Sequence, residues 1–122
     1  MAYCKENNPH YKQYLKNKSF LGCVAFSKCD FYLDWAITVL FYCVIHLVEM
    51  KFSEIKVPQS NSHFDRRNEV LKNNAFENIR REYVKLEQAS RKYRYECPVP
   101  PARYYYVHLY QLFLKVEKEL FN

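Results

Sequence analysis

The chain has a single glycine in 122 residues, and this scarcity limits the folds open to it more than any other feature. Glycine supplies the positive φ angles on which tight hairpin turns and glycine-rich phosphate loops depend. Nucleotide sites built on such loops, and meandering β-barrels, are therefore nearly excluded. At this length one compact domain over residues 1–122 is expected, and 49% hydrophobic residues are enough to build its core.

Hydrophobic periodicity predicts an all-α protein, a bundle of four to five helices. Ser62 is followed three residues later by Asp65, a capping-box pattern that starts a short helix. Asp30 or Asp34 is expected to cap the central helix, and Asn73 with Asn74 to interrupt the short one. Besides the short helix, the expected helical segments are residues 9–27, 31–52, 76–92 and 101–121.

Cysteine content and hydropathy favour a cytoplasmic protein with no membrane partner. The five cysteines are an odd number without a C-x-x-C pair, which is typical of a reducing compartment. The first residues lack the apolar stretch of a signal peptide. The longest apolar run, Trp35–Val48, has 14 residues, whereas a membrane span needs roughly 17–25. We therefore expect a buried central helix there.

The net charge of +6 indicates an anionic partner, and one candidate for contacting it is the start of the short helix. His63, Arg66 and Arg67 lie there, beside backbone N–H groups that attract phosphate. His63 and Arg67 are four residues apart and so share a helix face. The alternative interpretation is a capped helix with a solvated basic turn.

A second basic segment interleaves arginines with tyrosines at the end of the helix expected over 76–92. Tyrosines that stack on bases beside arginines that bind phosphate are common on surfaces for single-stranded RNA. Here Arg91 and Arg94 alternate with Tyr93 and Tyr95. The alternative is that both tyrosines pack inward while the arginines pair with Glu87 and Glu96.

Arg103 and His108 are the candidate catalytic pair. A histidine acting as general acid or base, with an arginine holding the scissile phosphate, can cleave RNA without a metal. Five helical steps place the two residues about 140° apart around the axis and about 7.5 Å apart along it. They converge only if Arg103 bends back or a partner chain completes the site. In the alternative interpretation, both are ordinary surface or boundary residues.

The remaining histidines and cysteines suggest neither a metal site nor a cofactor. The four histidines show no H-x3-H spacing, and no second pair of ligands accompanies the cysteines. His46 lies in the apolar helix, where a structural histidine with a hydrogen-bond partner is expected more often than a catalytic one. Cys43, three residues away, stands in a segment too apolar to admit a substrate easily.

Three motifs together resemble the HEPN-domain proteins of the stand-alone prokaryotic type. They are W-A-x4-F-Y-x3-H from Trp35, S-H-x2-R-R from Ser62, and Y-x2-L-x3-S-R-x2-R-Y from Tyr83. The order and spacing of the motifs carry the resemblance, which extends over roughly residues 10–121. It implies an up-and-down HEPN-like helical bundle, usually a homodimer, in a class that includes RNA-cleaving toxins and defence nucleases.

The same resemblance implies a function for the last helix. Toxin members of the class that are paired with a nucleotidyltransferase carry R-x4-H-x-Y, and Arg103, His108 and Tyr110 match that form. The leading hypothesis is thus an RNA-binding protein, which the resemblance extends to a metal-independent endoribonuclease. Its expected partners are RNA or a nucleotide, a second copy of the chain, and a cognate antitoxin or nucleotidyltransferase. His63, Arg66, Arg67, Arg94 and Tyr110 would bind the RNA. The alternative is a non-catalytic helical module that binds a nucleotide, a nucleic acid or a partner protein.

Overall fold

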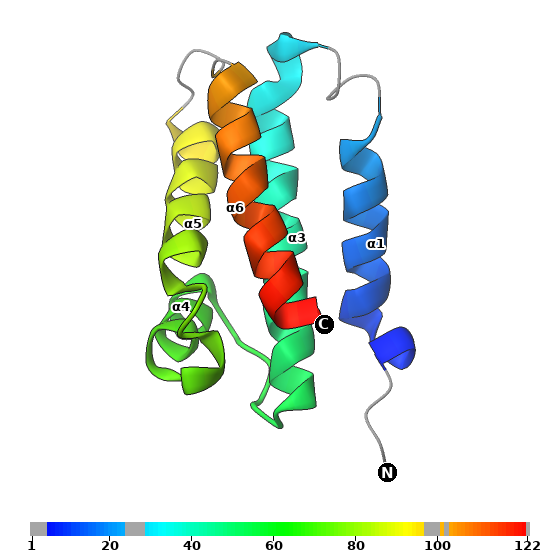
Figure 1. Ribbon diagram of the computed structural model, residues 1–122, viewed down its shortest axis with the longest axis vertical. Coiled ribbons are helices and arrows are strands. Elements are labelled where there is room, and N and C mark those ends of the chain that lie inside the picture. The colour runs from blue at the N-terminus through cyan, green and yellow to red at the C-terminus, as the bar shows by residue number, and fades with distance from the viewer. Residues whose placement is uncertain (1–4, 24–28, 97–100, 102, 122) are drawn as a thin grey trace.

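The structure is a computed structural model, and it describes residues 5–23, 29–96, 101 and 103–121. These residues form five α-helices packed together, with short 3-10 turns between them and no strand within these ranges. The helices are α1 (Pro9–Leu21), α3 (Leu33–Glu54), α4 (His63–Lys72), α5 (Arg80–Tyr95) and α6 (Arg103–Phe121). Figure 1 shows that α1, α3, α5 and α6 lie side by side along the long axis.

The central helix α3 organises the core. It packs against α1, α5 and α6, and most of its residues are buried, including Leu33, Leu40 and Phe41. A helix that is apolar on all sides needs such neighbours on every face. By length and composition alone the segment Asp30–Glu54 could cross a membrane, and 61% of its most apolar stretch is buried inside the bundle. A central core helix of this kind was predicted from the sequence.

The start of α3 differs from the sequence prediction, whereas the start and the end of α4 agree with it. Neither Asp30 nor Asp34 caps α3: Asp30 opens a 3-10 turn that leads directly into the helix, and Asp34 lies within the first turn. Ser62 does cap α4, because its side-chain oxygen accepts a hydrogen bond from the Asp65 N–H at 3.1 Å. Asn73 ends α4 and caps the next 3-10 turn, so the predicted interruption is confirmed.

The helix boundaries also differ. The first helix was predicted to run to residue 27, but α1 ends at Leu21, where Gly22 turns the chain and donates to the Ser19 carbonyl; residues 24–27 lie outside the described ranges. The fourth helix was predicted over 76–92, whereas α5 starts at Arg80 after a 3-10 turn and continues to Tyr95. This extension places Arg94 and Tyr95 on the helix itself.

At the end of α3 a lysine occupies a backbone position where glycine is usual. Lys56 adopts a left-handed conformation with a φ of 64°, and the Val57 N–H donates to the Phe52 carbonyl at 2.8 Å. This Schellman-type ending usually has a glycine at the left-handed position, where a side chain costs about 1–2 kcal/mol. The chain tolerates a lysine here, so this turn is made without glycine.

Candidate nucleic-acid interface

The two basic segments singled out in the sequence meet at one small cavity, here called the α4–α5 cavity. Its volume is about 170 Å³. His63 comes from the start of α4, Phe41 from α3, and the other lining residues from the second half of α5. The complete lining is Phe41, His63, Glu87, Ser90, Arg91, Arg94 and Tyr95. The cavity therefore combines cationic, aromatic and buried polar side chains.

Two of the predicted phosphate-binding arginines are held by glutamates. Arg66 Nε lies 2.9 Å from Glu49 Oε1 on α3, and these side chains are only 11% and 2% exposed. Arg67 Nε lies 3.4 Å from Glu87 Oε1 on α5. Both arginines thus connect α4 to the bundle, and the expectation of a solvated basic turn does not apply to them.

His63 is a neutral imidazole among cations. Arg66 donates to its Nδ1 at 3.1 Å, which leaves the proton on Nε2. Its ring stacks on Phe41 with the centroids 6.3 Å apart. Burial lowers the pKa of His63, and the charges of Arg66, Arg94, Arg91 and Arg67 lower it further. An anion bound in this cavity would raise the pKa of His63 again, because its negative charge would offset part of the effect of the arginines.

Arg94 lies between two tyrosine rings. Its Nη1 donates to the Tyr42 hydroxyl, and its guanidinium carbon lies 5.6 Å from the Tyr42 ring centroid and 4.6 Å from that of Tyr95. Tyr95 is exposed, and Tyr93 packs against Tyr105. The predicted alternative, in which both tyrosines pack inward and Arg94 pairs with a glutamate, is therefore wrong for Tyr95 and for Arg94.

Three buried polar atoms at the α4–α5 cavity have no hydrogen-bond partner among the described residues. They are Glu87 Oε2, Ser90 Oγ and Arg94 Nε. Glu87 is 5% exposed and Ser90 1%. Buried polar groups are nearly always hydrogen-bonded, because leaving one unpaired costs about 1–3 kcal/mol. These atoms need a partner that the described residues do not supply, and an ordered water or a bound ligand can provide it.

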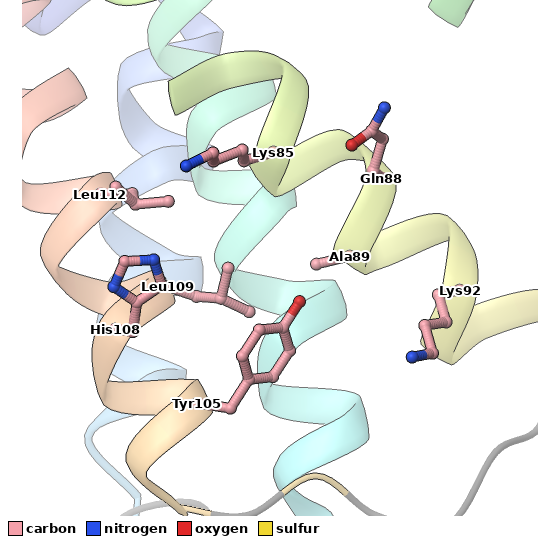
Figure 2. A pocket seen from close by; sticks show the side chains of 8 residues that line it. All are labelled: Lys85, Gln88, Ala89, Lys92, Tyr105, His108, Leu109 and Leu112. Atoms are coloured by element: carbon pink, nitrogen blue, oxygen red, sulfur yellow. The ribbon is translucent and has the colours of Figure 1, made fainter. Parts of the chain in front are cut away.

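A second cavity, of about 350 Å³, lies between α5 and α6 and holds His108. Lys85 and Lys92 reach it from α5, and Tyr105 extends its hydroxyl towards Ala89 (Figure 2). Gln88, Leu109 and Leu112 complete the lining. An exposed histidine beside two lysines can perform acid–base chemistry on a bound anion.

Arg103 is not part of this second cavity. It lies at the start of α6, and its Nε donates to Asp30 Oδ1 at 2.6 Å in an ion pair on the surface. Within one chain, the lining of the cavity that holds His108 does not include Arg103. Tyr110 packs against Phe113 and Tyr106 on the same helix and lines neither cavity.

His46 has an unexpected partner. Its Nδ1 lies 2.8 Å from the Nδ1 of His10 on α1, so one ring donates and the other accepts. Burial lowers the pKa of both, and that of His46 to about 4. Burial likewise raises the pKa of the Cys43 thiol to about 12, which makes it a poor nucleophile at neutral pH.

The structure thus brings His63 and Arg94 together, with Arg91 beside them, and separates Arg103 from His108 in a single chain. Glu87 and Ser90 were not proposed as site residues, whereas Arg91 belongs to the second basic segment that was singled out in the sequence. The sequence contained one signal for them: Glu87, Ser90, Arg91 and Arg94 are three to four residues apart and so share a helix face. A glutamate among arginines was interpreted only as an ion-pair partner.

The fold and this site define an all-α protein with a small basic and aromatic cavity. Comparisons with family models, with curated proteins and with solved structures each found no match. Among the described residues, no group of three or more His, Cys, Asp and Glu side chains is arranged to hold a metal ion.

Proposed function

We propose that this protein binds single-stranded RNA at the α4–α5 cavity. The observation that carries the proposal is the convergence of His63, Arg91 and Arg94 from two distant parts of the chain on one cavity that also holds unpaired polar atoms. The two arginines would hold phosphate, and the exposed ring of Tyr95 would stack on a base. The all-α bundle of five helices supports assignment of the chain to the HEPN-like class that its motifs resemble.

Arg91 and Arg94 are the residues expected to contact phosphate. Arg91 is exposed, and Arg94 has a buried Nε without a partner in the described part of the chain, whereas Arg66 and Arg67 are held in ion pairs. Replacing both with alanine is expected to weaken binding of a fluorescent single-stranded oligoribonucleotide about 10- to 100-fold, as measured by anisotropy. The slope of log affinity against log salt should become shallower by about 0.7 for each phosphate that the variant no longer binds.

Arg81→Ala is the matched control for these variants. Arg81 is an exposed arginine near the other end of α5, so its removal lowers the net charge without touching the cavity. A loss of affinity in Arg81→Ala equal to that of Arg91→Ala or Arg94→Ala alone would mean that only the overall charge matters. An unchanged salt slope in the double variant would remove this cavity from the interface.

RNA cleavage without a metal is a second candidate function, favoured by the position of His108 in the α5–α6 cavity beside Lys85 and Lys92. In EDTA, His108→Ala is expected to lower the rate of cleavage of total RNA by about 100- to 10,000-fold, as gel electrophoresis would show. Arg103→Ala tests the catalytic pair predicted from the sequence, Arg103 with His108. A similar loss of cleavage rate would require Arg103 to act from a second chain. Equal cleavage by wild type and His108→Ala would exclude His108 from the reaction.

The partners implied by the HEPN resemblance stay predictions. A homodimer would bring two copies of Arg103 and His108 into one assembly, which the molar mass in solution would reveal. Exposed aromatic side chains near the starts of α3 and α6, Phe31, Trp35 and Tyr104, are available for such contacts. A cognate antitoxin or nucleotidyltransferase is proposed on the resemblance alone.

A further inference from the structure

The unpaired atoms of the α4–α5 cavity define the chemistry of the molecule that fits it. Arg94 Nε is a donor and needs an acceptor, which a phosphate oxygen supplies. Glu87 Oε2 needs a donor when the carboxylate is ionised, and Ser90 Oγ can donate or accept. A ligand that satisfies all three atoms therefore carries an anionic group and a hydroxyl or N–H donor close together.

A simple anion would leave this site incomplete. Glu87 Oε1 faces Arg67 at 3.4 Å, but Oε2 has no partner among the described residues, and a phosphodiester or sulfate beside it would offer only acceptors. Burial raises the pKa of Glu87, because the carboxylate has lost water that the cavity does not replace. A hydroxyl that donates to Oε2 would restore that solvation.

The size of the cavity further limits which ligand can bind there. The cavity volume of about 170 Å³ is well below the roughly 300–1,000 Å³ of pockets that enclose a whole drug-sized ligand. This is room for one sugar ring or one phosphate group inside the cavity, with the neighbouring groups at its rim. The exposed Arg91 and Tyr95 stand at that rim, where a phosphate and a base would follow.

We propose that the α4–α5 cavity binds one ribose 3′-phosphate unit, with the 2′-hydroxyl donating to Glu87 Oε2 and the phosphate on Arg91 and Arg94. Ser90 Oγ lies in the same cavity and hydrogen-bonds the sugar. Because deoxyribose lacks the 2′-hydroxyl, binding it would leave Glu87 Oε2 buried and unpaired. The cavity thereby selects RNA over DNA. This inference rests on the proposed RNA binding and assigns its specificity to Glu87.

The test compares ribo- and deoxyribo-oligonucleotides of one sequence, with wild type and Glu87→Gln. Wild type is expected to bind the RNA about 10- to 100-fold more tightly than the DNA, the range expected for one hydrogen bond to a charged acceptor. Glu87→Gln should bring that ratio close to one. Glu77→Gln, which alters an exposed glutamate before α5, should leave the ratio unchanged.

A second measurement needs no change in the protein. Single 2′-deoxy substitutions are placed along the oligoribonucleotide, and one position should reproduce most of the RNA–DNA difference with wild type but not with Glu87→Gln. Competition by adenosine 3′-monophosphate and by its 2′-deoxy form tests whether a free nucleotide, and not only a strand, fills the cavity. If the ribo form alone competes, the contact between the 2′-hydroxyl and Glu87 is supported.

Three outcomes separate the two proposals. If no RNA, DNA or nucleotide binds, the proposed function fails and this inference fails with it. If RNA and DNA bind equally, the RNA-selecting role of Glu87 is overturned while nucleic-acid binding stands. If RNA is preferred equally by wild type and by a folded Glu87→Gln, the preference arises elsewhere, and the assignment to Glu87 is wrong.

Discussion

Replacing Arg66 with alanine is expected to lower the free energy of unfolding by about 3–5 kcal/mol, the largest effect we predict for a polar residue. Glu49 is 2% exposed on the core helix, and Arg66 Nε is the cation that pairs with one of its oxygens. The other oxygen accepts from the Ser60 N–H at 3.4 Å. Removing Arg66 would leave a buried carboxylate with too few donors, and α4 would lose its ion pair with α3.

Urea unfolding measures this loss, and a double variant provides the control. Arg66→Met combined with Glu49→Leu removes both charges and keeps the apolar volume, so it should be much closer to wild type than Arg66→Ala alone. Equal destabilisation in the single and double variants would show that the packing of the arginine stem, and not the uncompensated carboxylate, accounts for the loss. The result also decides whether weak RNA binding by an Arg66 variant reflects unfolding.

Stability is expected to fall as the pH drops from about 6.5 towards 4, because of the pair formed by His10 and His46. In the folded chain, burial together with the charges of His10 and Arg66 lowers the pKa of His46 to about 4, compared with 6.5 for an unperturbed imidazole, against a smaller opposing effect of Glu49. The unfolded chain therefore takes up protons first. The contribution of His46 to stability is complete above pH 6.5 and is lost as the pH falls through about 4, with a slope of at most about 1.4 kcal/mol per pH unit.

The measurement is the urea midpoint at pH 7.5 and pH 5.5, a range that lies above the titration of most carboxylates. For His46 alone, about 1 kcal/mol of the free energy of unfolding should disappear between these two values. In His46→Leu this part of the pH dependence should be absent. An identical pH dependence in the variant would mean that other groups, such as His63, whose pKa burial also lowers, dominate the range.

The secondary structure was largely predictable from local patterns. The Ser62 cap and the break at Asn73 are both confirmed, because capping depends on side chains within three residues of the helix end. The start of α3 was less predictable: Tyr32 precedes it without a side-chain cap, since a 3-10 turn leads into the helix. A local sequence pattern does not distinguish such a turn from a first helical turn.

The candidate site was predictable only in part. His63 and Arg94 were selected because basic and aromatic residues cluster around each of them. Their convergence depends on how α4 and α5 pack, which no local pattern encodes. The roles of Glu49 and Glu87 were missed for the same reason: each pairs with an arginine of α4 that is 17 or 20 residues away in the sequence.

By itself, the sequence determined an all-α protein with a buried central helix, because one glycine in 122 residues leaves few turns for sheets and because α3 is apolar on nearly every face. The tertiary structure decided which of the basic residues remain available to a ligand. Buried glutamates hold Arg66 and Arg67, while Arg91 and Arg94 line a cavity with unpaired polar atoms. Charge can be counted along a chain, but ion pairing depends on distances across the packed helices.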